Sequence, residues 1–306
     1  MNNNRKKYIV LGVSAVFVAL LAVIIFLFIN KDENKNWVFK EMQIERIWAY
    51  AEGDTQTVAF IDTGISDKMY DQLSNKIVYK YNVIDDNYEV NDAHGHGTEM
   101  VSIVGNDDYL GVYGIAPKAK LIIIKAVSDE GKTNNDYLYK ALKVAEDKGA
   151  TIVSISLGGF KSDQKVIEQI ESMVEKNITI ASAAGDYGNK DLLFPAKIKN
   201  VVSVEALSEN RSIWKNSNSS DESIIRIAGC NIDTISFDQY GKLEKVSLTG
   251  TSEACAVASG YIALVRDYYT KNNIDYNNEK ILDILKKLNT KQDKKVDYLT
   301  PFKDQK

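Results

Sequence analysis

Short apolar runs alternate with amphipathic stretches along the chain from Trp37 onward. A short apolar run bounded by polar residues is typical of a buried strand, whereas apolar residues at helical spacing indicate a helix packed on one side. Strands that alternate with helices favour a parallel sheet covered by helices, so we predict one α/β domain with a central, mostly parallel sheet. The predicted strands are 57–61, 121–127, 151–156, 178–184 and 201–206, and the predicted helices are 136–148, 165–176, 254–265 and 279–288.

A longer apolar run lies near the start of the chain, at Tyr8–Ile29, and contains no charged residue. It is long enough to cross the hydrocarbon core of a bilayer as a helix. Three basic residues, Arg5–Lys7, precede it, so the positive-inside rule places the N-terminus in the cytoplasm. The alternative is a cleaved signal peptide, whose apolar region is normally shorter and ends in a small-residue cleavage site. We predict a cytoplasmic N-terminus (1–7), a single-pass membrane anchor (8–29), a linker (30–36) and an extracytoplasmic domain (37–306).

Charge and composition disfavour several classes of protein. The 306 residues carry a formal net charge of −4, and no basic stripe with interleaved aromatic residues indicates a nucleic-acid partner. No glycine-rich phosphate loop follows a strand, which disfavours a nucleotide-binding protein. The two cysteines, Cys230 and Cys255, are too few for a disulfide scaffold. They either form one disulfide bridge or remain free as small buried residues, and we expect the second arrangement. We also expect the protein to be a monomer.

Candidate chemistry centres on Ser252, which follows the turn Gly250–Thr251 and precedes a helix rich in small residues. A serine in this position has a simpler role as a helix N-cap. A nucleophilic serine needs a base of near-neutral pKa and a carboxylate that fixes the tautomer of that base. The chain offers two histidines, His94 and His96, and an aspartate, Asp62, at the end of the first predicted strand. A zinc pair of the two histidines is disfavoured because no cysteine or further histidine lies nearby.

Three segments of the chain carry Asp, His and Ser in that order. They are Ala59–Ile65 around Asp62, Gly95–Thr98 around His96, and Gly250–Ser252. In sequence and order they resemble the catalytic signatures of the subtilisin-like serine peptidases, the subtilases. The stretches between them are similar to the connecting segments of that family: Gly114–Leu121, Ser154–Gly159, Ala181–Gly185 and Phe194–Ala196. The resemblance extends from about Trp37 to the C-terminal helix and implies the three-layer α/β fold of subtilisin.

The resemblance implies a role for each matching residue. Ser252 is expected to be the nucleophile, His96 the general acid and base, and Asp62 the carboxylate that orients His96. His96 matches rather than His94 because it directly precedes the Gly-Thr of the family motif. The implied activity is hydrolysis of peptide bonds through an acyl-enzyme, with no cofactor required for the chemistry. The residues expected to bind the substrate, including the pocket for the side chain before the cut, are Ser156, Leu157, Gly158, Ala183, Ala184, Leu193 and Phe194.

Several residues depart from the family pattern. Asp186 stands at the oxyanion-hole position, where the family has an Asn that donates a hydrogen bond, and an ionised carboxylate donates none. In subtilisin itself, loss of this donor costs about 10²–10³ in kcat. A protonated Asp186, or the backbone N–H of Ser252, would offset the loss. Glu253 replaces the usual Met, and Ala256–Val257 replaces the usual Pro-His. The family bond that matches Phe194–Pro195 is usually cis, so a cis bond is expected here.

Calcium binding is common among subtilases. The loop 106–109 offers Asp107 and Asp108 as candidate ligands, because calcium prefers oxygen donors. A solvated acidic loop is the simpler interpretation of the same two residues.

The sequence therefore predicts a membrane-anchored, extracytoplasmic serine endopeptidase that processes an exported peptide or protein. The alternative is a catalytically impaired subtilase-fold protein that binds peptides or acts as a partner. Asp186 and the pair Ala256–Val257 motivate this alternative, because they alter residues next to the nucleophile.

Overall fold

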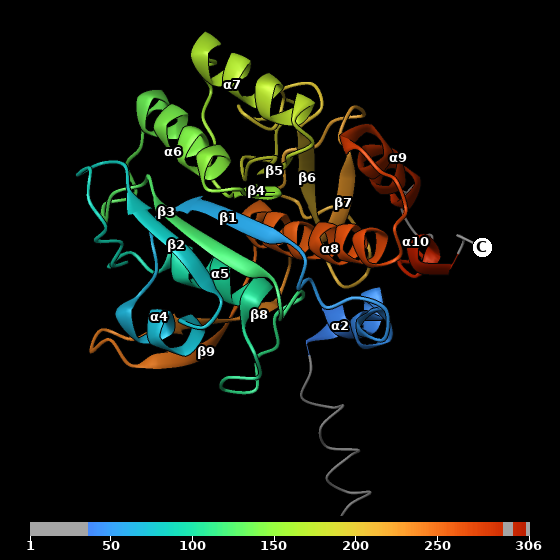
Figure 1. Cartoon of the computed structure of the whole chain (residues 1–306), viewed down its shortest axis with the longest axis horizontal. Helices are drawn as coiled ribbons and strands as arrows, with labels where there is room; N and C mark the ends of the chain where they lie inside the picture. Colours follow the sequence, from blue (N-terminus) through green and yellow to red (C-terminus); the bar gives the residue numbers. More distant parts are fainter. Residues whose placement is uncertain (1–35, 290–295, 304–306) are drawn as a thin grey trace, which may run out of the picture. The chain divides into compact units, whose positions relative to one another are not determined.

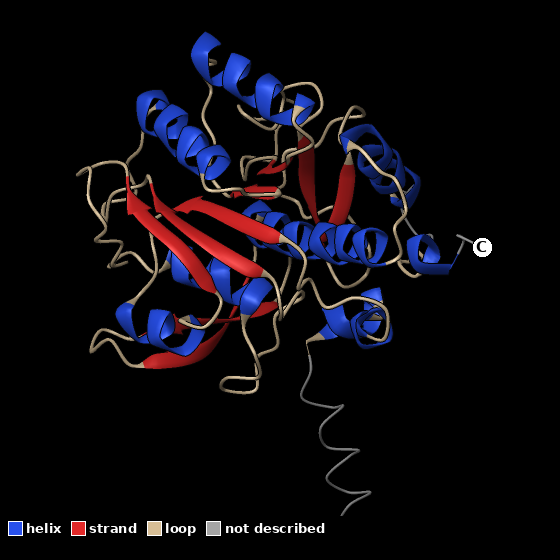
Figure 2. Ribbon diagram, in the orientation of Figure 1, coloured by secondary structure: helices blue, strands red, loops and turns tan. Residues whose placement is uncertain are grey.

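The protein, as a computed structural model, is described over residues 36–289 and 296–303. The centre of this part is a seven-stranded sheet in the order β2-β3-β1-β4-β5-β6-β7, and all neighbouring strands in it are parallel (Figure 2). The prediction of an α/β fold with a central parallel sheet is confirmed. The strands of this sheet are β1 (Thr57–Asp62), β2 (Ile77–Asn82), β3 (Lys120–Lys125), β4 (Ile152–Ile155), β5 (Thr179–Ala183), β6 (Val202–Leu207) and β7 (Ile225–Ala228). An antiparallel hairpin is formed separately by β8 (Ile232–Phe237) and β9 (Leu243–Leu248).

Helices cover both faces of the sheet. α6 and α7 lie on one face, and α5 and α8 lie on the other (Figure 1). Because successive side chains of a strand point to opposite faces, β1 contributes to both layers: Val58 and Phe60 join the apolar cluster of α5 and α8, while Ala59 and Ile61 join that of α6 and α7. The helices are α2 (Trp37–Met42), α3 (Ile44–Trp48), α4 (Asp67–Leu73), α5 (His96–Gly105), α6 (Asn135–Asp147), α7 (Gln164–Glu175), α8 (Thr251–Lys271), α9 (Asn278–Leu288) and α10 (Thr300–Lys303).

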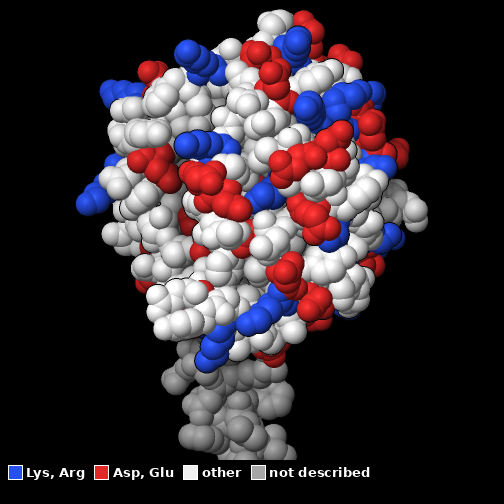
Figure 3. Space-filling view, turned by 90° about the vertical axis from the view of Figure 1, so that its left-hand side faces the viewer, with Lys and Arg blue, Asp and Glu red and all other residues white. Residues whose placement is uncertain are grey.

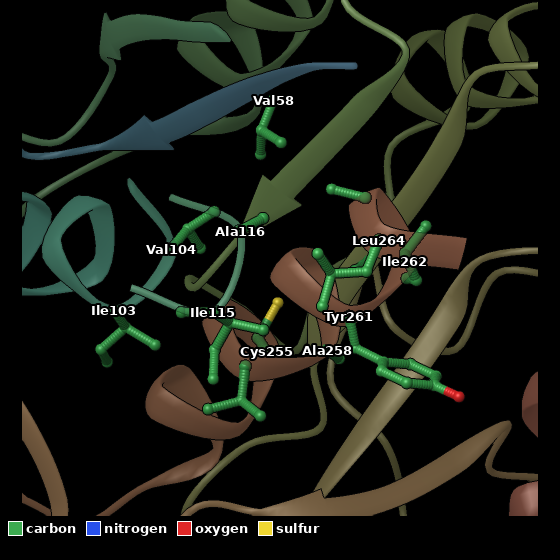
Figure 4. Close-up of a cluster of buried hydrophobic side chains, with 14 of the residues drawn as sticks. Val58, Ile103, Val104, Ile115, Ala116, Cys255, Ala258, Tyr261, Ile262 and Leu264 are labelled. Carbon is green, nitrogen blue, oxygen red and sulfur yellow. The ribbon is translucent and has the colours of Figure 1, made fainter. Parts of the chain in front are cut away.

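Helix α8 is almost wholly buried, which explains its small side chains. A Cβ on Gly260 would lie 2.7 Å from the Cβ of Ile115, so only glycine permits this close approach. Around this contact Cys255, Ala258 and Tyr261 of α8 lie in the same apolar cluster as Ile115 (Figure 4). Close packing along its length fixes the helix, and therefore the position of its first turn.

The other end of α8 is tied to the turn that precedes β1. Asp267 is fully buried, and its carboxylate accepts hydrogen bonds from the backbone N–H groups of Glu52 (3.1 Å), Gly53 (3.0 Å) and Thr55 (3.1 Å). Several donors to one carboxylate compensate its removal from water. The helix that carries Ser252 and the strand that carries Asp62 are thus joined by a polar contact far from both residues.

The predicted anchor (8–29) and most of the linker lie outside the described residues. Within 36–289 and 296–303, no helix is long and apolar enough to cross a bilayer. On the face drawn in Figure 3, acidic and basic side chains are interspersed. A surface of mixed sign produces no strong single-sign field toward a partner.

Candidate active site

The carboxyl ends of neighbouring strands β1, β4 and β5 supply the polar side chains of the site. Asp62 is the last residue of β1, Ser156 follows β4, and Asp186 follows β5 by three residues. In open α/β sheets the carboxyl ends of the strands form the crevice where ligands bind. The end of β1 is also fixed, because the backbone C=O of Asp62 accepts hydrogen bonds from the N–H groups of Ala126 (2.9 Å) and Val127 (3.1 Å).

His96 is the first residue of α5, and its ring contacts the carboxylate at the end of β1. The distance from Nδ1 of His96 to Oδ1 of Asp62 is 2.7 Å. Gly97 brings α5 close to this turn, since a Cβ at that position would lie 2.3 Å from the backbone oxygen of Gly64. His94, by contrast, is exposed, and its ring centroid lies 6.3 Å from that of His96. The geometry thus pairs Asp62 with His96.

The pKa of His96 is raised to about 9. Burial on its own lowers this pKa, because it disfavours the charged imidazolium. The negative charge and hydrogen bond of Asp62 outweigh burial, and the charges of Glu253 and Glu99 add to the increase. His96 in the free protein is therefore a stronger base than an isolated imidazole.

Ser252 lies in the first turn of α8, one residue after the helix begins. Its hydroxyl donates to the backbone C=O of Ser156 (3.2 Å), and the Ser156 hydroxyl donates to the backbone C=O of Ser252 (3.2 Å). Among the hydrogen bonds of the described residues, none joins Ser252 to His96. The interpretation of Ser252 as a helix cap is wrong, because Gly250 occupies the N-cap position.

Asp186 accepts hydrogen bonds at the start of α8, where the N-cap residue Gly250 has no side chain to do so. Its Oδ1 accepts hydrogen bonds from the backbone N–H (3.0 Å) and the hydroxyl (2.7 Å) of Thr251, and that hydroxyl accepts one from the N–H of Gly185 (3.1 Å). A carboxylate at a helix N-terminus is stabilised by the N–H groups that have no partner within the helix. Asp186 therefore positions the turn that carries Ser252. That it faces an oxyanion stays a prediction.

A second carboxyl group approaches Asp186 beside the same turn. A Cβ built on Gly250 would lie 2.6 Å from Oε2 of Glu253 and 3.2 Å from Oδ2 of Asp186. Both carboxyl groups thus converge on the space that Gly250 leaves open. Glu253 is only 6% exposed, and its pKa is raised to about 7. Burial is the largest cause, and the negative charges of Asp186 and Glu99 add to it. The hydrogen bond from its own backbone N–H and the positive charge of His96 lower the pKa and offset part of the increase.

The predicted substrate-binding residues come from the segment after β4, from the end of β5 and from the pair 193–194. Phe194 forms an antiparallel bridge with Gly159, with N–H···O distances of 2.8 and 2.9 Å in the two directions. The Phe194–Pro195 bond is cis, as expected. Leu193 donates its N–H to the C=O of Ala184 (3.0 Å), which places it beside the end of β5. Five of the seven predicted residues are buried: Ser156, Ala183, Ala184, Leu193 and Phe194. Leu157 is half-buried and Gly158 is exposed.

This arrangement of a carboxylate, an imidazole and a helix-borne serine agrees with comparisons to known proteins. Residues 53–300 match the Subtilase family. The chain belongs to the subtilase family.

Individual relatives support the assignment. The subtilase is 31% identical over 242 residues to the "Major intracellular serine protease" of Bacillus subtilis (strain 168). The matched region covers 75% of this chain and 74% of the relative. It is 26% identical over 228 residues to "Thermitase" of Thermoactinomyces vulgaris, covering 74% and 80% of the two chains. The crystal structure of a cold adapted subtilisin-like serine proteinase superposes with a TM-score of 0.68 at 20% identity, covering 80% of this chain and 85% of the other. The predicted fold family and the class of enzyme, a serine endopeptidase, are confirmed.

Three positioning residues of the subtilase were missed from the sequence. Asp92 is buried, and its Oδ1 accepts from the N–H groups of His94 (3.1 Å) and Gly95 (2.8 Å), while its Oδ2 accepts from Thr98. The Thr63 hydroxyl accepts from the N–H of Gly97 (2.8 Å). These contacts hold the segment that presents His96, and an aspartate four residues before the candidate histidine was the available signal.

The third missed residue is Glu253, which the sequence marked only as a departure from the family pattern. Its closeness to Asp186 and its effect on the pKa of His96 depend on folding, and neither follows from residue order.

The candidate calcium loop of the subtilase is engaged in other contacts. Asp107 lies 3.6 Å from Nζ of Lys76, and Asp108 is hydrogen-bonded to the hydroxyl of Tyr113. In the part of the chain that the structure describes, no group of three or more His, Cys, Asp or Glu residues is placed to hold a metal. Calcium binding stays a prediction. Both cysteines, Cys230 and Cys255, are free and buried, as expected.

Replacing Glu253 by Gln tests the electrostatics of this site. Glu253→Gln removes a negative charge that favours the imidazolium, so the pKa of His96 is expected to fall below about 9. Since a general base must be neutral to accept a proton, the rise of kcat/KM with pH moves to lower pH, by about 0.5 to 1.

The measurement is kcat/KM for a peptide substrate between about pH 5 and pH 10. Glu168→Gln, an exposed substitution on α7, is the matched control and should leave the profile unchanged. Superimposable profiles for Glu253→Gln and the wild type would contradict the electrostatic assignment.

Proposed function

We propose that the subtilase is a membrane-anchored, extracytoplasmic serine endopeptidase in which Ser252 is the nucleophile, His96 the general acid and base, and Asp62 the orienting carboxylate. The observation that carries the proposal is the 2.7 Å contact between Nδ1 of His96 and Oδ1 of Asp62. This bond leaves Nε2 of His96 as the nitrogen that exchanges protons with the serine. Its substrates are peptides or proteins, in keeping with relatives named as serine proteases.

In the proposed reaction Ser252 Oγ leaves the C=O of Ser156 and passes its proton to Nε2 of His96 as it attacks the substrate carbonyl. The peptide C–N bond then breaks, and His96 gives that proton to the leaving amine, so that an acyl-enzyme remains on Ser252. A water molecule, deprotonated by His96, attacks the ester and releases the new carboxyl terminus. Asp62 keeps its charge throughout and stabilises the imidazolium.

Negative charge on the substrate oxygen needs hydrogen-bond donors nearby. The N–H of Ser252, in the first turn of α8, is one such donor, because the first N–H groups of a helix have no partner within it. Asp186 is proposed to lie on the same side, with its Oδ1 already occupied by Thr251. The second oxygen donates only when it is protonated.

A second candidate function is a peptide-binding protein of the same fold with little or no activity. Two observations favour it: the Ser252 hydroxyl donates to Ser156 and not to His96, and Asp186 acts as an acceptor. Catalytic hydrogen bonds are often loose in the free enzyme and tighten with substrate, which favours the peptidase.

Labelling by a serine-directed fluorophosphonate separates the two functions. The wild type is expected to take one label, at Ser252, and Ser252→Ala none. His96→Ala is expected to be labelled at least about 10³-fold more slowly, because the hydroxyl loses its base. A folded wild-type protein that stays unlabelled between about pH 5 and pH 9 would overturn the peptidase proposal.

The membrane part of the proposal rests on residues 1–35 alone. The uncharged run Tyr8–Ile29 and the preceding basic residues Arg5–Lys7 support a single span with the catalytic domain outside. Relatives named both as intracellular and as extracellular proteases match the chain, so their names favour neither compartment. Processing of an exported peptide or protein fits a tethered peptidase domain.

Fractionation of cells that make the full chain tests the anchor. The protein is expected in the membrane fraction, to resist extraction by high salt and alkali, and to be degraded by external protease in intact protoplasts. A variant that begins at Asn36 should remain in the cytosol. Recovery of the full chain from the soluble fraction would contradict the proposal.

A further inference from the structure

The space beside Ser252 is bounded by two chain segments that leave adjacent strands of the sheet. One segment follows β4 and contacts Ser252 through Ser156. The other follows β5 and contacts the neighbouring Thr251 through Gly185 and Asp186. A peptide whose carbonyl carbon reaches Ser252 places the side chain that precedes the cut next to these two segments.

A leucine side chain occupies the space between the two segments. A Cβ on Gly158 would lie 3.0 Å from Cβ of Leu193, and a Cβ on Gly185 would lie 2.7 Å from its Cγ. Both distances are shorter than ordinary carbon–carbon contact, so Leu193 already touches the glycine backbone on each side. Leu193 is only 7% exposed. Little volume is left between the segments for another large side chain.

Two exposed aromatic side chains from the same two segments are in contact with each other. Phe160, which comes from the segment after β4, and Tyr187, which comes from the segment after β5, have ring centroids 5.4 Å apart. They are 68% and 62% exposed, so their contact lies at the surface. Asn218, which is fully buried, accepts the N–H of Tyr187 (2.9 Å) and donates to the C=O of Asp191 (2.8 Å), and so holds the second segment in place.

A cavity of about 410 Å³ is lined in part by Leu193. Leu193 and Phe160 line it, whereas Gly158, Gly185 and Ser252 do not. This cavity is therefore distinct from the space between the two segments, although Leu193 borders both.

We propose that Leu193 closes the pocket for the side chain before the cut, so that the subtilase cleaves after residues with small side chains: glycine, alanine or serine. Larger side chains are excluded by contact with Leu193 and by the pair Phe160–Tyr187. The inference rests on the proposed function, because it takes Ser252 as the nucleophile. It narrows the substrates to peptides with a small residue at the cleavage site.

The test compares two quenched fluorescent peptides that differ only in the residue before the cut, alanine or phenylalanine. Fluorophosphonate titration first measures the concentration of protein with a reactive Ser252. This measurement uses no peptide, so it does not depend on the residue before the cut. The wild type is expected to prefer alanine by at least about tenfold in kcat/KM, since even one methylene group in an apolar pocket changes this ratio by about 10–200-fold. Leu193→Gly is expected to raise kcat/KM for the phenylalanine peptide by about 10–200-fold and to change that for the alanine peptide much less.

Two further variants keep the test decisive. Leu192→Ala alters the cavity without opening the pocket, so the preference for alanine should be retained. Phe160→Ala changes an exposed side chain and is expected to fold even where Leu193→Gly does not; it should raise kcat/KM for the phenylalanine peptide severalfold. A titratable wild type that prefers phenylalanine, or does not discriminate, overturns this inference and leaves the proposed function intact. A wild type that cannot be titrated overturns the proposed function and this inference with it.

Discussion

The first turn of α8 is held from both sides, and the rest of the site depends on this constraint. On one side the carboxylate of Asp186 binds the N–H and hydroxyl of Thr251, and on the other Ser156 exchanges two hydrogen bonds with Ser252. Both partners lie just beyond adjacent parallel strands, so the sheet sets their spacing. Burial of α8 by small side chains fixes the helix behind this turn.

Electrostatics distinguishes this site from a simple Asp-His-Ser arrangement. Asp62, Glu99 and Glu253 all favour the protonated form of His96 and raise its pKa, although burial opposes them. The proposed base is therefore strong but mostly protonated at neutral pH. The carboxyl groups of Glu253 and Asp186 both lie beside Gly250, next to the turn that carries Ser252. Their negative charge would repel the negative charge that the proposed reaction creates on the substrate oxygen. A buried carboxyl group with a pKa of about 7 relieves part of this repulsion by taking up a proton.

Much of the fold could be predicted from the sequence, because strands buried on both faces consist of nearly continuous runs of apolar residues. The predicted strand 57–61 and helix 136–148 differ from β1 and α6 by a residue or so at each end. β2 was missed because its side chains are mostly half-buried and its run Ile77–Asn82 mixes tyrosine with lysine. α5 was missed because glycines on both sides of His96 resemble a loop, and Asp92 holds that segment through contacts that local propensity does not contain.

In the site, family motifs pointed to Asp62, His96 and Ser252 as candidates, but the contacts that each residue makes had to come from the structure. The N-cap interpretation of Ser252 failed because the cap comes from Asp186, which lies far away in the sequence. The packing of Leu193 between two glycines is likewise a tertiary contact.

In the proposed reaction, negative charge develops at the first turn of α8, where Asp186 withholds a hydrogen bond that an amide would donate. Asp186→Asn tests this claim most directly, because the Asn Oδ1 can still accept from Thr251 while its amide replaces the second carboxylate oxygen. The decisive measurement is kcat with a peptide substrate, at matched thermal stability. We expect kcat to rise toward the factor of about 10²–10³ known for this donor in subtilisin itself, with little change in KM. An unchanged or lower kcat in a folded Asp186→Asn variant would contradict it.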